Sequence, residues 1–162
     1  LMYQAVPEGT DPARAEAAIE RWRELYPECG IELTKPYEGM VEVLSQLKVQ
    51  GKKLAVLSNK FDGGVQELIP AFFSDTFDAV HGVSADIPRK PDPTGLLFTM
   101  DEIGADPETT AYVGDSGSDM QTARNAGVFA LGVSWGYRPE EELIEEGADA
   151  IVRDPSGILG FS

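Results

Sequence analysis

The chain has 162 residues, 42% hydrophobic and 25% charged, which is enough for one ordinary globular domain with at most a small appendage. Its 28 acidic and 13 basic residues give a formal net charge of −15, which repels nucleic acid and anionic membrane surfaces and makes both poor candidate partners. The single cysteine, Cys29, excludes an internal disulfide and favours a reducing, cytoplasmic compartment.

The first part of the chain predicts one amphipathic helix over residues 11 to 28. Asp11 is the expected N-cap, and Gly30 is the expected end. The apolar residues that recur at helical spacing, and that we expect to pack against another helix, are Ala15, Ile19, Trp22 and Tyr26. Cys29 is interpreted as a small, partly buried residue near the helix end. An extended connector at 34 to 36 predicts two domains, residues 1–34 and residues 35–162.

From residue 37 onward, helices and short apolar strands alternate. We expect helices over 37–50, 64–73, 93–103, 117–126 and 139–146, and strands over 54–57, 79–80, 111–113, 129–133 and 150–152. Strands that are apolar on both faces and alternate with helices are typical of a parallel sheet covered on both sides. We therefore predict an α/β fold with a Rossmann-like three-layer αβα sheet.

Two polar clusters lie where ligands bind in such sheets, at the carboxyl ends of the strands. Ser58-Asn59-Lys60 follows the strand at 54–57, and its hydroxyl and amide can hold phosphate oxygens, although Ser and Asn are also ordinary turn residues. Lys90 stands between Arg89 and Pro91, ahead of the helix at 93–103. Its ammonium can neutralise a phosphate or an acidic nucleophile. Alternatively, Lys90 is a solvated side chain at a helix start that proline caps.

The third cluster, Gly114-Asp115-Ser116-Gly117-Ser118-Asp119, follows the strand at 111–113. Gly114 allows a sharp exit from the strand, and Asp119 returns to the side of Asp115 four residues later. Two carboxylates with waters and phosphate oxygens suit Mg²⁺, which prefers oxygen ligands. The alternative is that both aspartates only stabilise a helix N-terminus, and we favour the metal site.

In this order and after these strands, the three clusters resemble the haloacid dehalogenase-like superfamily, and within it the phosphoglycolate phosphatase group. Residues 36–155 carry the resemblance, which also includes Lys90-Pro91-Asp92-Pro93, Asp119 through Ala126-Gly127, and Trp135-Gly136-Tyr137-Arg138. Residues 1–33 resemble the later part of that group's small helical cap. The resemblance therefore implies a partial cap over 1–34 and a catalytic core over 35–162.

The resemblance also implies residue roles in hydrolysis of a small phosphorylated metabolite through an aspartyl-phosphate. Ser58 and Asn59 would bind the phosphoryl group, and Lys90 would stabilise the nucleophile and the phosphate charge. Asp115 would bind Mg²⁺, and Asp119 would support it directly or through water. Phosphoglycolate is the first expected substrate, and a pyrophosphatase or a sugar-phosphate mutase would use the same residues.

The sequence departs from the family at its first motif, because no two of its aspartates are separated by a single residue. In the family, Asp-x-Asp supplies the nucleophile from a first strand that lies between the Ser58 and Asp115 strands. We therefore expect that strand to precede Leu1, and this chain alone to be inactive and to bind Mg²⁺ weakly or not at all. The gap could be filled by a lost or retained N-terminal fragment, a swapped partner chain, or residues 1–10.

Other functions stay open at this point. The chain could be a non-catalytic phosphate- or metal-binding remnant completed by another chain. A receiver-type signalling domain is disfavoured because the aspartate pair follows a late strand, and a dehalogenase is disfavoured because it needs no metal. We expect His81 to be structural or solvent-facing. Trp135, Tyr137 and Arg138 could border the substrate entrance, or the aromatic residues could pack beneath their loop.

Overall fold

A computed structural model describes residues 6–7, 9–29 and 34–161 and divides the chain into two compact units, Leu1–Lys35 and Pro36–Ser162. The first unit contains helix α2 (Pro12–Cys29). Asp11 Oδ1 accepts hydrogen bonds from the N–H groups of Ala13 (3.0 Å) and Arg14 (3.2 Å), which confirms the N-cap. The predictions for the side chains of Tyr26 and Cys29, and for Gly30, lie outside the described part of the molecule.

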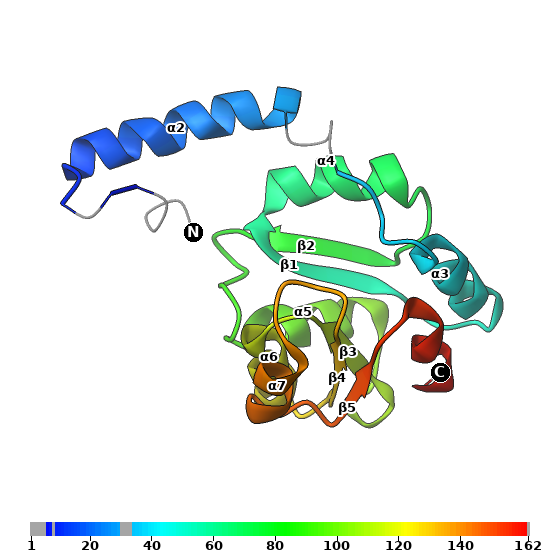
Figure 1. The fold of residues 1–162 in the computed structure, drawn as a ribbon. Coiled ribbons are helices and arrows are strands. Elements are labelled where there is room, and N and C mark those ends of the chain that lie inside the picture. The colour runs from blue at the N-terminus through cyan, green and yellow to red at the C-terminus, as the bar shows by residue number, and fades with distance from the viewer. Residues whose placement is uncertain (1–5, 8, 30–33, 162) are drawn as a thin grey trace. The chain divides into compact units, whose positions relative to one another are not determined.

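The second unit alternates helices and strands as the sequence predicts (Figure 1). Its helices are α3 (Met40–Val49), α4 (Asp62–Phe72), α5 (Thr94–Ile103), α6 (Gly117–Ala126) and α7 (Glu140–Glu145). Its strands are β1 (Ala55–Phe61), β2 (Ala79–Val83), β3 (Ala111–Gly114), β4 (Phe129–Val133) and β5 (Ala150–Val152). Two 3-10 helices, η1 (Pro107–Thr109) and η2 (Pro155–Phe161), were not predicted. None of the described helices is both long enough and apolar enough to cross a membrane.

Strand β1 is longer than predicted, so Ser58, Asn59 and Lys60 lie within the strand and not in a turn after it. The strand continues because β2 offers partners up to Phe61, which pairs with Val83. The parallel register is regular only as far as Leu57 and shifts before Phe61. The Ser58 hydroxyl accepts a hydrogen bond from the Lys60 N–H within this irregular stretch, at 3.1 Å. Such a bulge re-aims the side chains that it contains.

The five strands form two parallel sheets. One has the order β1-β2 and the other the order β3-β4-β5 (Figure 1). Within the described ranges, no strand links β1 to β3. Each sheet is parallel throughout, as the apolar strands and the intervening helices predict.

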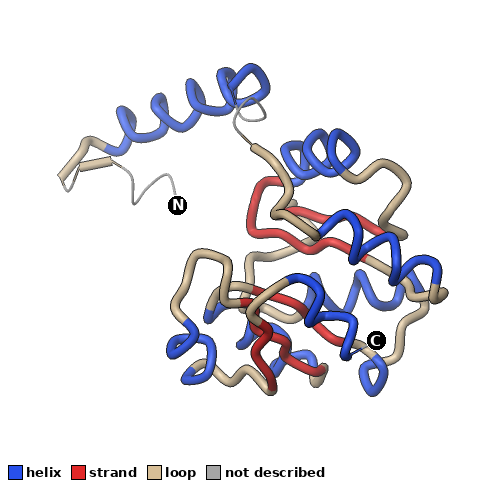
Figure 2. Tube along the Cα trace, turned by 45° about the vertical axis from the view of Figure 1, so that its right-hand side comes forward, coloured by secondary structure: helices blue, strands red, loops and turns tan. Residues whose placement is uncertain are grey.

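Helices cover both faces of the three-stranded sheet (Figure 2). Adjacent residues of β4 show this directly, because Ala130 and Leu131 are both fully buried and belong to different core clusters. Ala130 packs with residues of α5, α6 and α7, among them Met100, Met120 and Leu143. Leu131 packs with α3 and η2 residues, among them Leu47 and Ile158. The three-layer α/β fold is therefore confirmed.

Candidate active site

Lys90 lies in the loop between β2 and α5 and connects β1 to the start of α6. Its ammonium donates to Asp119 Oδ1 at 2.5 Å and lies 3.5 Å from the carbonyl oxygen of Leu57. The side chains of Lys90 and Asp119 are only 12% and 6% exposed. The ammonium therefore bridges β1 and the helix that follows the carboxyl end of β3, and the region after such strand ends is where open parallel sheets bind ligands.

Two asparagine side chains fix the loop that carries Lys90. Asn59 Oδ1, on β1, accepts a hydrogen bond from the Lys90 N–H at 2.8 Å, and its Nδ2 lies 3.5 Å from the Lys90 carbonyl oxygen. Asn125 Nδ2, on α6, donates to the carbonyl oxygen of Pro91 at 3.0 Å. The position of the ammonium is therefore set by contacts to two neighbouring elements. Pre-positioned charge of this kind can stabilise a charged reacting group without reorganisation.

Asp119 has both carboxylate oxygens engaged. Oδ1 accepts from Lys90, and Oδ2 accepts from the Ser116 N–H at 3.1 Å and from its hydroxyl at 2.6 Å, as part of a capping box at the start of α6. Gly114 makes this close packing possible, because a Cβ there would lie 2.2 Å from Asp119 Cβ. Asp119 therefore orients Lys90 and caps the helix in this structure.

Asp115 is held differently, by a loop that follows β4. Its Oδ2 accepts a hydrogen bond from the Tyr137 N–H at 3.0 Å. Its Oδ1 makes no hydrogen bond to the part of the chain that the structure describes. No group of three or more His, Cys, Asp or Glu side chains suited to a metal occurs among the described residues. Mg²⁺ uses one or two carboxylates and keeps several waters, so oxygen donors such as Asp115 fit Mg²⁺ better than a thiolate- or imidazole-binding metal.

Tyr112 connects β3 to β1 beneath this site. Burial raises the pKa of Tyr112 well above its ordinary value, and the nearby carboxylates of Asp119 and Asp115 raise it further. The phenol therefore stays protonated and donates to the Leu57 carbonyl oxygen at 3.3 Å. Its ring also lies beside the Lys90 ammonium, 5.7 Å from the centroid.

The structure brings together some of the predicted site residues but not all of them. Asn59, Lys90 and Asp119 form one connected network, and Asp115 precedes the capping box of that network. The only described side-chain hydrogen bond of Ser58 is to Lys60. His81 lies on β2, where it pairs with Glu102 Oε2 at 2.6 Å.

Several contacts were not predicted from the sequence. The hydrogen bond from Tyr137 to Asp115 involves only the backbone N–H, which leaves no signature in the residue type. Asn125 and Tyr112 serve the site through contacts distant in the chain. The one available signal was Gly136, where a Cβ would lie 2.2 Å from Asp115 Cβ.

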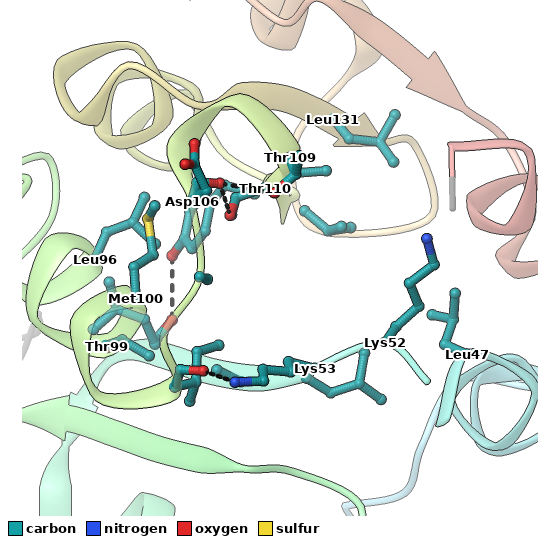
Figure 3. Close-up of a pocket in the computed structure, with 18 of the residues that line it drawn as sticks. Leu47, Lys52, Lys53, Leu96, Thr99, Met100, Asp106, Thr109, Thr110 and Leu131 are labelled. Atoms are coloured by element: carbon teal, nitrogen blue, oxygen red, sulfur yellow. Dashed lines mark hydrogen bonds between the residues drawn. The ribbon is translucent and has the colours of Figure 1, made fainter. Parts of the chain in front are cut away.

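A cavity of about 480 Å³ lies between β1 and β3 (Figure 3). Its lining includes Ala55 and Leu57 from β1 and residues 111 to 113 from β3. Figure 3 shows apolar side chains, among them Leu47 and Leu131, with Lys53 bonded to a backbone carbonyl at one side. None of the candidate site residues, Ser58, Asn59, Lys90, Asp115 and Asp119, lines this cavity. It is therefore a slot between two strands, lined by apolar side chains and by polar ones such as Lys52 and Asp106, and separate from the candidate site.

Comparison with known proteins gives consistent matches. The family model described as haloacid dehalogenase-like hydrolase matches residues 2–133. A phosphoglycolate phosphatase from Pseudomonas putida is 33% identical over 150 residues, which are 92% of this chain and 55% of that protein. A phosphoglycolate phosphatase from Caulobacter vibrioides is 36% identical over 88% of this chain and 60% of its own length.

A solved structure from Lactobacillus delbrueckii subsp. bulgaricus superposes with a TM-score of 0.85 at 32% identity, over 94% of this chain and 64% of that one. The chain thus spans less than two thirds of the length of these relatives.

Proposed function

Because the chain belongs to the haloacid dehalogenase-like hydrolase family, we propose that it forms most of the core of a Mg²⁺-dependent phosphomonoester hydrolase, with phosphoglycolate as the first candidate substrate. One observation carries the proposal. The buried Lys90 ammonium is paired with Asp119 in the first turn of α6, and its backbone N–H is held by Asn59 of β1. A fixed cation beside a carboxylate suits a phosphate and the metal that accompanies it.

Each residue of the site has a distinct role in this proposal. Lys90 holds the phosphoryl oxygens and the attacking carboxylate, and Asp119 keeps its ammonium oriented. Ser58 and Asn59, within β1, would donate to the phosphoryl oxygens. Asp115 would hold Mg²⁺, which when bound neutralises phosphate charge. Asp119 would support the metal site through its hold on Lys90 and on the Ser116 cap.

The reaction needs a nucleophilic aspartate. The family takes it from an Asp-x-Asp motif, and these 162 residues contain no such motif. An aspartate oxygen would attack phosphorus, the bond from phosphorus to the ester oxygen would break, and the leaving alkoxide would take a proton from the second aspartate. Water would then cleave the aspartyl-phosphate and release inorganic phosphate. Alone, the chain is proposed to be inactive and to bind Mg²⁺ weakly.

We propose that the strand carrying these aspartates would occupy the slot between β1 and β3. In the described residues β1 pairs with β2 and β3 pairs with β4, and a cavity separates the two sheets. A single parallel strand with apolar residues would satisfy the ladders on both sides. The carboxyl end of such a strand would come close to Lys90, where aspartates would be neutralised.

A fusion that places an apolar strand ending in Asp-x-Asp ahead of the chain tests the function. We expect Mg²⁺-dependent phosphate release, with phosphoglycolate preferred over pyrophosphate and glucose 1-phosphate. Asp115→Asn and Lys90→Met should each lower kcat/KM by about 100-fold or more, as removal of an electrostatic stabiliser does. A folded fusion that hydrolyses none of the three substrates would refute the proposed function.

A further inference from the structure

The loop that follows β4 makes an unusually close contact with Asp115. Residues 134 to 139 connect β4 to α7, and within them the Tyr137 N–H donates to Asp115 Oδ2 at 3.0 Å. A Cβ on Gly136 would lie 2.2 Å from Asp115 Cβ and 2.3 Å from Oδ2. Gly136 is not in the left-handed region, so space and not backbone conformation demands a glycine there.

The same loop is anchored just ahead of the contact. The Ser134 N–H donates to the carbonyl oxygen of Val152 at 3.1 Å, which ties the start of the loop to β5. Trp135 packs against the core cluster formed by α3, β4, β5 and η2. The Tyr137 side chain, in contrast, is 90% exposed. The loop therefore offers Asp115 a fixed backbone donor and does not depend on the Tyr137 ring.

We propose that Gly136 and the Tyr137 N–H are positioning groups for Asp115, which hold Oδ2 so that Oδ1 is the oxygen presented to a divalent cation. The inference rests on the proposed function in one respect, the role of Asp115 toward Mg²⁺. A carboxylate with one oxygen committed to a backbone donor presents the other as a single ligand atom. Octahedral Mg²⁺ sites are built from such single oxygens, and outer partners of metal ligands commonly set their orientation.

A second tyrosine lies close to the same carboxylate. Burial, then the charge of Asp115 and then Tyr137, raise the pKa of Tyr37 above its ordinary value. Tyr37 is 51% exposed and Asp115 itself is half-buried, so this carboxylate keeps part of its surface open to solvent.

Backbone and side-chain variants of Tyr137 separate positioning from other roles. Tyr137→Pro removes the N–H, whereas Tyr137→Ala keeps it and removes the ring. Titration of the chain with MgCl₂, followed by NMR shifts of residues around Asp115, should show Mg²⁺ binding weakened about 10-fold or more by Tyr137→Pro and little changed by Tyr137→Ala. Gly136→Ala should behave like Tyr137→Pro. Gly160→Ala, at a position with open space, is the matched glycine control.

The Tyr137 amide gives a readout that needs no metal. In Asp115→Ala, this amide proton should move upfield and exchange faster with solvent. The positioning role is wrong if Asp115→Ala leaves the chemical shift and exchange rate of the Tyr137 amide unchanged. It is also wrong if Tyr137→Pro and Gly136→Ala bind Mg²⁺ as tightly as the wild type. If Mg²⁺ shifts no resonance near Asp115 in either the wild-type chain or its fusion to the Asp-x-Asp strand, yet the Tyr137 amide responds to Asp115→Ala, the metal role of Asp115 fails while the backbone contact stands.

Discussion

Asp78 ties the start of β1 to the start of β2 through a reciprocal pair of hydrogen bonds. Its carboxylate accepts from the Leu54 N–H at 2.8 Å, and its own N–H donates to the Leu54 carbonyl oxygen at 2.7 Å. Lys48 also donates to the carboxylate, at 3.2 Å. The hydrogen bond from Leu54, more than the charge of Lys48, lowers the pKa of Asp78 below its ordinary value.

This depressed pKa makes a prediction about stability and pH. A carboxyl whose pKa is lower in the folded state stabilises the fold above its unfolded pKa, 3.8, and loses that contribution as pH falls through the folded pKa. Asp78→Asn should therefore be less stable than the wild type at neutral pH, and the difference should shrink in acid. Urea unfolding from pH 7 to about pH 2.5 measures it. Asp101→Asn is the exposed control, and a difference independent of pH would contradict the prediction.

Residue types predicted the members of the site but not their pairing. The chemistry of Lys90, Asn59 and Asp119 and their place after predicted strands indicate a shared site. The ion pair between Lys90 and Asp119 depends on how the loop before α5 returns toward β3, which local pattern does not encode. The support of Mg²⁺ by Asp119, directly or through water, stays a prediction, and the structure adds that its carboxylate pairs with Lys90 and the Ser116 cap.

At the scale of elements, the sequence predicts each described α-helix and strand of the second unit, because each has a local apolar periodicity and clear ends. The largest error was the end of β1. Polar Ser58, Asn59 and Lys60 looked like a turn, and only the partner strand β2 extends the pairing to Phe61. The two 3-10 helices were missed because short turns of this kind carry little periodicity.

The junction of β3 and α6 gives a prediction at this scale. Gly114 ends β3, and a Cβ there would lie 2.2 Å from Asp119 Cβ and 2.9 Å from its Oδ2. Gly114→Ala should cost about 1–3 kcal/mol in the free energy of unfolding, because overpacking forces the start of α6 away from the strand. Urea unfolding measures the loss, with Gly160→Ala as a control that should change stability by about 0.5 kcal/mol or less. Equal stabilities of the two variants would show that the junction has room to relax.

At the scale of the second unit, the two sheets and the slot between them are the central feature. Alternating helices and strands predicted the three-layer architecture from the sequence alone. Periodicity does not reveal that the strands form two sheets and not one, because strand order depends on contacts between distant segments. A gap in the sheet is expected only because the family resemblance implies an Asp-x-Asp strand that this sequence lacks.

Complementation by a strand peptide tests the central claim most directly. The chain is titrated with a peptide of about five apolar residues that ends in Asp-x-Asp, and phosphate release from phosphoglycolate is followed in MgCl₂, with an Asn-x-Asn peptide as the matched control. We predict no turnover by the chain alone and saturable turnover with the first peptide, lost in Lys90→Met. Both peptides should protect the amides of β1 and β3 from exchange. Turnover without any peptide, or protection of β1 and β3 by the Asp-x-Asp peptide without turnover, would contradict the account.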